Sequence, residues 1–211
     1  MLGRLLTLYI RAARLPTLPP PVEQPGFSEA ADALLRGEQV DIPEPRLDFL
    51  RWLGENRDVV FHGSPLGDLA ELSTERKSRD TTTWGDQTAV YASSDPVWAI
   101  YFAVLRRDKG WTGTRNGTLA IGDRRRYFFV HNHGSQSPDR FGPGTVYLLP
   151  PDTFEAEPPL AGTIDTAHLV SRVPVTPLAR VNVTPEDFPF RNRIGYFRGD
   201  REPIWLTLLR A

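Results

Sequence analysis

The sequence predicts an α+β domain built mainly on antiparallel sheets. From Asp58 onward, short runs of β-branched and aromatic residues are separated by Gly, Pro, Asp and Asn, and helical signals are few. Short strands in mixed order with few helices indicate antiparallel sheets rather than a regular alternation of strands and helices. The 211 residues suffice for one such domain with an extension, and 40% hydrophobic residues with five tryptophans indicate a folded core.

Composition excludes several classes of site and partner. The net charge of −1 provides no overall attraction to nucleic acid or to an anionic membrane. The chain has no cysteine, which excludes disulfides, thiolate zinc sites and a cysteine nucleophile. The apolar run between Arg4 and Arg11 is too short for a membrane-spanning helix of about 20 residues and fits a secretory signal poorly. We therefore expect a cytoplasmic protein with no membrane association.

Two regions are expected along the chain. Residues 1–56 are predicted to form a helical N-terminal extension, and residues 57–211 to form the domain proper. The extension begins with an amphipathic helix, and the prolines between Pro16 and Pro25 form a linker that cannot continue it. Two further helices are expected, one capped by Ser28 and one ending at Gly54.

Seven strands and one interior helix are expected in the domain proper. The helix has Asp95 as its N-cap and Pro96 at its first position, followed by an apolar run. The dipeptide Gly122-Asp123 supplies a turn, so the two strands that flank it are expected to pair as a hairpin. The predicted strands cover residues 59–62, 90–92, 118–121, 127–131, 146–149, 178–183 and 204–209.

Two of these strands end in segments that indicate a ligand site. The first run ends in His62-Gly63-Ser64, and the second carries Tyr91 and Ser93 just before the interior helix. These segments resemble the nicotinamide pocket of the ADP-ribosyltransferases, in the branch named after a histidine, a tyrosine and a glutamate. Within that branch the chain is similar to the rifampin ADP-ribosyltransferases and to the catalytic domain of the poly-ADP-ribose polymerases. The resemblance covers about residues 57–190.

The resemblance also indicates the third residue of the set. In the rifampin enzymes an acidic residue stands just before a proline, after a strand and a short turn, and here Phe154-Glu155-Ala156-Glu157-Pro158 follows the strand at 146–149. Glu157 matches by position, and Glu155 is its rival. A second stacking aromatic is implied in the helix after Tyr91, where Tyr101 is the first choice and Phe102 the second.

The resemblance implies an NAD-dependent mono-ADP-ribosyltransferase with an ADP-ribosyltransferase-like fold. Breaking the bond between nicotinamide and ribose requires a rigidly held nicotinamide and stabilisation of positive charge on the ribose. The implied catalytic residues are His62, which orients the ribose, Tyr91, which stacks on the ring, and Glu157, which stabilises the charge and positions the acceptor. The implied residues for binding NAD as a co-substrate are His62, Gly63, Ser64, Tyr91, Ser93 and Tyr101.

Other functions remain open at this point. The acceptor can be a protein, a nucleic acid or a small molecule, and the protein can be a bacterial toxin whose residues 1–56 meet an antitoxin or another partner. The alternatives to a transferase are an NAD glycohydrolase and an inactive module that binds NAD or ADP-ribose. No Gly-x-Gly-x-x-Gly fingerprint or Walker loop is present, so NAD would not bind in a Rossmann manner. His131 and His133 have no third ligand at suitable spacing, so no metal is expected.

Overall fold

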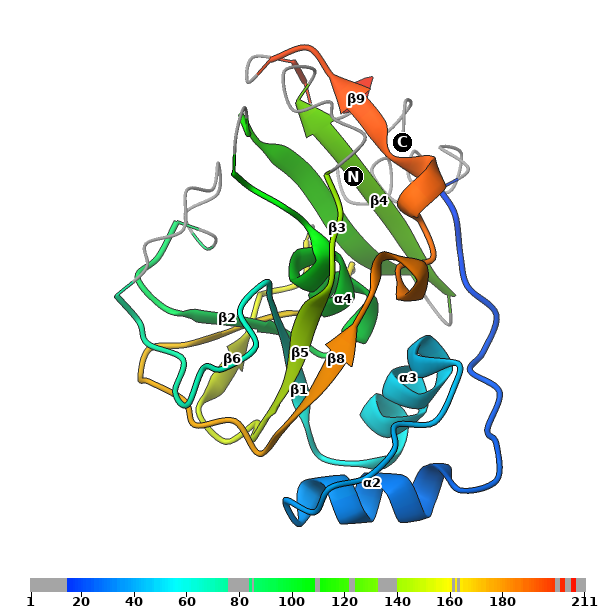
Figure 1. Cartoon of the computed structure of the whole chain (residues 1–211). Coiled ribbons are helices and arrows are strands. Elements are labelled where there is room, and N and C mark those ends of the chain that lie inside the picture. Colours follow the sequence, from blue (N-terminus) through cyan, green and yellow to red (C-terminus); the bar gives the residue numbers. More distant parts are fainter. Residues whose placement is uncertain are drawn as a thin grey trace.

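The structure of the chain is a computed structural model, and it describes residues 15–75, 84, 86–108, 111–121, 124–132, 140–160, 162, 164–199, 202–203 and 206–207. These residues form two sheets, with helices between and beside them (Figure 1). The larger sheet has six strands in the order β6-β7-β2-β1-β5-β8, and the smaller has three in the order β3-β4-β9. Among the described strands, β4 and β9 pair in parallel and all other pairs are antiparallel. The predicted α+β class with mainly antiparallel sheets is confirmed.

The larger sheet contains four strands close to their predicted positions and two others. Its strands are β1 (Val60–Ser64), β2 (Val90–Ser93), β5 (Gly144–Leu149), β6 (Phe154–Ala156), β7 (His168–Ser171) and β8 (Ala179–Val183). The sequence did not predict β6, which has only three residues, too few for an alternating pattern to show. Strand β7 lies at the start of the segment 169–175, where the resemblance implied a strand.

Helix α4 (Pro96–Val104) packs against the larger sheet and begins as predicted. Asp95 is its N-cap, and the Asp95 carboxylate accepts a hydrogen bond from the Val97 amide at 2.8 Å. The other carboxylate oxygen accepts bonds at 2.9 Å from the Tyr127 hydroxyl and from Arg125, both on the smaller sheet. One buried side chain therefore ties the start of the helix to the second sheet.

The smaller sheet confirms the predicted hairpin and corrects the last predicted strand. It consists of β3 (Thr114–Ile121), β4 (Arg124–Asn132) and β9 (Gly195–Phe197), and β3 and β4 pair along their whole length. Of the strand predicted at 204–209, the structure describes only residues 206 and 207. Both amides donate to the Pro203 carbonyl in a helical turn, so a strand there is wrong.

Two helices of the predicted extension belong to the same core as the sheets. Helices α2 (Phe27–Leu35) and α3 (Arg46–Asn56) bury Phe27, Phe49 and Leu53 in one cluster with Phe61 of β1 and with α4. Of the helices in the described part, none has the length and apolar character needed to cross a membrane.

The helix ends in this region differ from the prediction. Helix α2 is capped by Gly26, whose φ of 91° is left-handed, rather than by Ser28. Helix α3 continues past Gly54 to Asn56, so the predicted stop at Gly54 is wrong. The glycine instead lets the Phe61 ring approach closely, because a Cβ at Gly54 would lie 2.9 Å from that ring.

The segment before α2 is also part of the fold. The predicted first helix lies almost wholly outside the described residues, but Leu15 is buried and the Pro16 carbonyl accepts a bond from the Tyr127 amide at 3.0 Å. The Pro19 carbonyl accepts a bond from Arg51 of α3. In Figure 1 this segment runs from the smaller sheet down to α2. The proline-rich segment is thus attached at one end to the smaller sheet and further along to helix α3.

This attachment predicts a specific loss of stability. Leu15→Ala should lower the free energy of unfolding by about 2 kcal/mol or more, because it removes a buried side chain and leaves a cavity. Val22→Ala is the matched control on the same segment, since Val22 is 63% exposed and should change stability by less than about 0.5 kcal/mol. Urea denaturation of the two variants measures the difference. Equal, small effects would mean that the segment contributes nothing to the fold.

Candidate functional site

The strand register places residues from four neighbouring strands in one row across the larger sheet. Phe61 of β1 lies opposite Ser93 of β2, and Ser93 lies opposite His168 of β7. The Glu157 amide, just after β6, donates to the His168 carbonyl at 2.9 Å. Residues directly opposite one another project from the same face of a sheet. Because Phe61 packs in the cluster that contains α4, the side chains of this row lie on the α4 face.

His62 and Tyr91 are joined directly beside this row. Strand β1 pairs with β5 at five positions but with β2 only at Phe61. Next to that position, the His62 Nδ1 lies 2.6 Å from the Tyr91 carbonyl oxygen. A carbonyl can only accept, so Nδ1 carries the proton and Nε2 holds the lone pair of the neutral ring. The structure therefore brings together the predicted histidine and tyrosine, which are 29 residues apart in the chain.

The hydroxyl of Tyr91 is fixed by the segment before its own strand. It accepts a bond from the Gln87 amide at 2.9 Å and donates to the Gln87 carbonyl at 3.1 Å. Tyr91 lies opposite Val170, and its ring is only half-buried. Its backbone and its hydroxyl are thus both held while part of its ring remains accessible, which suits a stacking role.

Packing against helix α4 requires a glycine at position 63, which the sequence did not reveal. A Cβ at this position would lie 1.8 Å from the Ala99 carbonyl oxygen of α4, so the helix backbone occupies the space that any side chain would need. The close backbone approach expected at this glycine is therefore an approach to α4. Contact of Gly63 with nicotinamide stays a prediction.

The two predicted serines hold turns. The Ser64 hydroxyl accepts a bond from the Leu66 amide at 3.1 Å, just after β1. The Ser93 hydroxyl accepts a bond from the Asp95 amide at 2.9 Å, and Ser93 is fully buried. Both serines shape the ends of the strands that carry His62 and Tyr91, and their contact with NAD stays a prediction.

Glu157 is a largely buried carboxylate with two donors on one oxygen. Its side chain is 11% exposed, and its Oε2 accepts bonds from the Thr166 hydroxyl at 2.7 Å and from His168 Nδ1 at 3.2 Å. Burial raises the pKa of Glu157, but the bonds from His168 and Thr166 together outweigh it and hold that pKa below its ordinary value. Glu157 is therefore ionised at neutral pH despite its burial.

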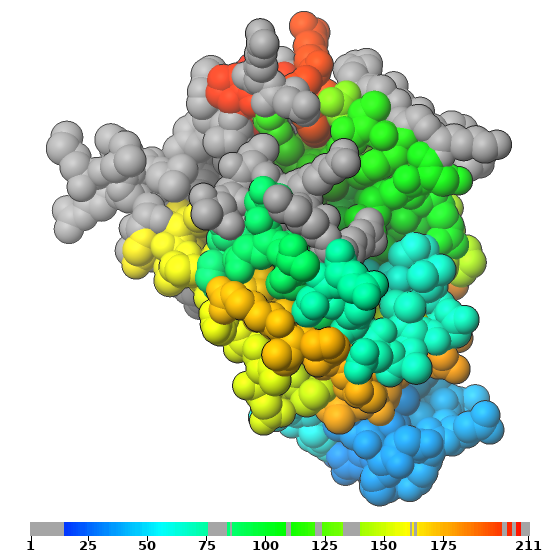
Figure 2. All heavy atoms as spheres, turned by 90° about the vertical axis from the view of Figure 1, so that its left-hand side faces the viewer, coloured from blue at the N-terminus to red at the C-terminus, as the bar shows by residue number. Residues whose placement is uncertain are grey.

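The rival glutamate lies in a different setting. Glu155 is 61% exposed and forms a surface ion pair with Arg172 at 2.6 Å. Arg172 also donates to the Gln87 side chain, next to Tyr91. Figure 2 shows this side of the molecule, where the orange segment after β7 runs beside the yellow segment around β6. Of the two glutamates, only Glu157 is held in the row with Ser93 and His168.

The structure corrects the prediction that Tyr101 stacks on a ligand. Tyr101 is fully buried, and its hydroxyl lies 2.6 Å from the Thr114 hydroxyl and 3.0 Å from His131 Nε2. Thr114 gives its one proton to the Val130 carbonyl, so Tyr101 donates to Thr114 and accepts from His131. Burial, with the nearby charge of Arg140, lowers the pKa of His131 to about 4. Tyr101 therefore belongs to the core between α4 and the smaller sheet.

The partly accessible aromatic residues of α4 are Trp98 and Phe102. They are four residues apart, on one side of the helix, with ring centroids 4.5 Å apart. The Trp98 ring lies 5.3 Å from that of His168, and its indole nitrogen donates to Asn116 at 2.8 Å. Trp98 thus lies next to the row, on the side where Tyr101 was expected to stack.

Removing the hydroxyl oxygen of Tyr101 tests whether this residue belongs to the core. Tyr101→Phe should lower the free energy of unfolding by about 1–3 kcal/mol, because it removes the buried acceptor of His131 Nε2 and the donor to Thr114. NAD affinity per folded molecule should not change. Chemical denaturation and calorimetry measure the two quantities. A variant of unchanged stability that no longer binds NAD would return Tyr101 to the site.

Sequence reasoning missed His168 and Thr166 as well as Trp98. Both flank Ala167, and neither forms part of a recognisable motif. The register of β7 against β2 is what brings His168 beside Ser93. A weak signal was present: a histidine one residue before the apolar pair Leu169-Val170 marks the beginning of a strand next to the tyrosine strand.

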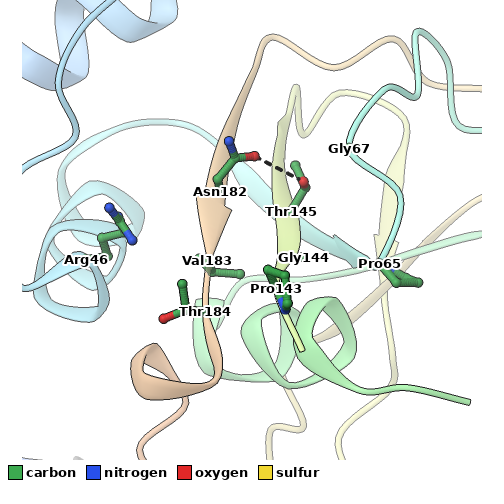
Figure 3. Close-up of a pocket in the computed structure, with 9 residues that line it drawn as sticks. All are labelled: Arg46, Pro65, Gly67, Pro143, Gly144, Thr145, Asn182, Val183 and Thr184. Atoms are coloured by element: carbon green, nitrogen blue, oxygen red, sulfur yellow. Dashed lines mark hydrogen bonds between the residues drawn. The ribbon is translucent and has the colours of Figure 1, made fainter. Parts of the chain in front are cut away.

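A pocket of about 280 Å³ lies elsewhere, against β5 and β8 (Figure 3). It contains none of the predicted site residues, and the Thr145–Asn182 contact at 3.3 Å spans its floor. Its lining residues are Arg46, Pro65, Gly67, Pro143, Gly144, Thr145, Asn182, Val183 and Thr184. Within the described ranges, no three His, Cys, Asp or Glu side chains are grouped to hold a metal, and His133 lies outside those ranges.

The geometry therefore joins His62, Tyr91 and Glu157 through one sheet and adds His168 and Trp98. This arrangement places an ionised carboxylate, the His168 imidazole and the Trp98 ring on the α4 face, whereas His62, which follows Phe61 in β1, projects from the other face beside Tyr147. No family model matches the chain, and comparison with curated proteins and with solved structures gives no significant match.

Proposed function

We propose that the protein is a mono-ADP-ribosyltransferase that uses NAD and releases nicotinamide. The observation that supports this most is the register of the larger sheet. It sets Glu157 and Ser93 in one row, beside the point where His62 bonds to Tyr91. His62, Tyr91 and Glu157 come from distant parts of the chain, and the segments that carry them resemble those of the ADP-ribosyltransferases.

The chemistry requires each of these groups. The bond between C1 of the ribose and the nicotinamide nitrogen breaks, and its electron pair goes to the nicotinamide ring. Positive charge then develops on the ribose, and a fixed anion next to it lowers the barrier. Glu157 is that anion, because its two hydrogen bonds keep it ionised and oriented. His62 and Tyr91 hold the ribose and the nicotinamide ring so that the departing group is correctly placed.

Incubation with NAD tests the proposal. Purified protein should release nicotinamide from NAD, slowly alone and faster in the presence of the right acceptor. Cell extract supplied with NAD labelled in the adenylate should show which molecule receives the label. Release of free ADP-ribose with no labelled acceptor would identify a glycohydrolase. Binding of NAD without release would identify an inactive binding module, and neither binding nor release would reject the proposal.

The acceptor and any partner of the extension are parts of the same proposal. A protein, a nucleic acid and a small molecule are all distinguishable by the mass of the labelled product. Helices α2 and α3 bury their apolar faces within the protein, so an antitoxin or other partner would have to meet their polar faces. Measuring the amount of labelled acceptor with and without an added partner protein shows whether that partner is the acceptor or a regulator of the transfer.

A further inference from the structure

Three side chains are held together at the end of the row. Thr166 and His168 both donate to the same oxygen of Glu157. Between them, Ala167 has a φ of 58°, in the left-handed region that residues with a side chain rarely adopt. The Ala167 carbonyl accepts a bond from the Ser94 amide at 3.0 Å, which fixes this conformation against the end of β2. Backbone strain of this kind is concentrated at functional sites.

The far nitrogen of the His168 ring lacks a partner. Because Nδ1 donates to Glu157, Nε2 of the neutral ring holds a lone pair that can accept a proton. In the part of the chain that the structure describes, Nε2 is buried and makes no hydrogen bond. Buried polar atoms almost always have a partner, so an unsatisfied acceptor in a candidate site needs an explanation. A hydroxyl group of a bound ligand would satisfy it.

We propose that His168 is a further catalytic residue, which accepts the proton of a hydroxyl group on the ADP-ribose acceptor, with Glu157 holding its ring in place. The inference rests on the proposed function and deepens it, because it assigns the acceptor to the alcohols. The acceptor oxygen forms a bond to C1 of the ribose once the bond to nicotinamide has broken. The electron pair of that bond leaves with nicotinamide, and the hydroxyl proton moves to Nε2.

An imidazole suits this step better than the carboxylate does. Both donors converge on Glu157, which weakens its oxygen as a proton acceptor. Imidazole is the side chain whose basicity best matches proton transfer near neutral pH. When Nε2 takes the proton, the positive ring remains bonded through Nδ1 to the negative Glu157, which stabilises the charged form.

The Trp98 ring packs next to the imidazole of His168 and is itself half-buried, and its indole nitrogen donates to Asn116. Nε2 is shielded from solvent in the present conformation, so a side chain near it has to move for a hydroxyl group to reach it.

Two competing acceptors in one reaction separate proton acceptance from all earlier steps. Methanol is the alcohol probe and must lose a proton when it is ADP-ribosylated. The probe 3-acetylpyridine replaces nicotinamide in NAD without losing a proton, so its reaction needs no base. With both present, the ratio of methyl ADP-ribose to the exchanged dinucleotide does not depend on how fast the nicotinamide bond breaks. Chromatography measures both products.

His168→Asn is the informative variant, and Thr166→Val is its matched control. The asparagine amide takes the place of Nδ1–H and can still donate to Glu157, but nothing replaces Nε2. The product ratio should fall about a hundredfold in His168→Asn, the usual contribution of a general base, while the exchange rate stays within about threefold. Thr166→Val removes the other donor to Glu157, so it should slow both products and leave their ratio unchanged.

The outcomes distinguish a proton-accepting His168 from one that only positions Glu157. An unchanged ratio in folded His168→Asn, or equal losses of both products, would show that His168 only positions Glu157. If the variant does not fold, wild-type protein in deuterium oxide tests whether a base removes the alcohol proton at all: transfer to methanol should slow and exchange should not, and equal rates would overturn the inference. Wild-type protein that releases no nicotinamide at all would instead reject the proposed function.

Discussion

Replacing Glu157 with glutamine is expected to lower the turnover of NAD about a hundredfold or more and to change NAD affinity less than about threefold. Glutamine keeps the size and one acceptor oxygen but removes the negative charge. A charge that acts mainly on the cationic transition state affects the chemical step far more than binding. Steady-state nicotinamide release and calorimetric titration with NAD measure the two effects separately.

Glu155, two residues earlier and within β6, provides the matched control. Glu155→Gln removes an exposed ion pair with Arg172, which contributes little in solvent. It leaves the hydrogen bonds from Thr166 and His168 to Glu157 intact. We expect turnover within about twofold of the wild type for this variant. If Glu155→Gln were the damaging change and Glu157→Gln the mild one, the catalytic carboxylate would be the exposed one, and the row would not be the site.

Gly63→Ala is expected to destabilise the fold by about 3 kcal/mol or more. The new methyl group would lie 1.8 Å from the Ala99 carbonyl oxygen and 2.8 Å from the Ala103 amide nitrogen, so α4 would have to move away from β1. The neighbouring Gly67 is the control, because a Cβ there would meet its nearest atom, the Thr145 hydroxyl, at 3.4 Å. Gly67→Ala should change the free energy of unfolding by less than about 1 kcal/mol.

The stability of Gly63→Ala decides whether the activity of this variant can report on contact between Gly63 and nicotinamide. If Gly63→Ala unfolds the protein, loss of activity in that variant says nothing about contact with nicotinamide. A stable Gly63→Ala variant would instead show that α4 yields easily, and the packing argument for this glycine would be wrong. Urea denaturation of the two glycine variants distinguishes these outcomes.

Local features of the fold were predictable from the sequence because local residues determine them. The Asp95 cap needs only an acceptor side chain two residues before the Val97 amide. The hairpin of β3 and β4 needs only two apolar runs and a short turn between them. The strands that carry His62 and Tyr91 were predictable for the same reason, since their apolar runs are short and clearly bounded, although β1 continues past His62 to Ser64.

Features that depend on distant contacts were not predictable. Tyr101 and Trp98 both lie on α4, and only the position of the smaller sheet decides that Tyr101 faces the core and Trp98 the site. His168 joins the site through the register of β7 with β2, and a shift of one residue would turn it to the other face. The attachment of Leu15 and Pro16 likewise depends on β4, more than 100 residues away.

Binding of NAD to the wild-type protein is the most direct test of the central claim. Calorimetric titration with NAD at up to millimolar concentration should show saturable binding at one site per chain, and added nicotinamide should compete with it. Trp98→Ala should weaken this binding by about 0.5–1.5 kcal/mol through loss of an aromatic contact, whereas Tyr101→Phe should not. Absence of any saturable binding at millimolar NAD would contradict the assignment of this row as a nicotinamide site.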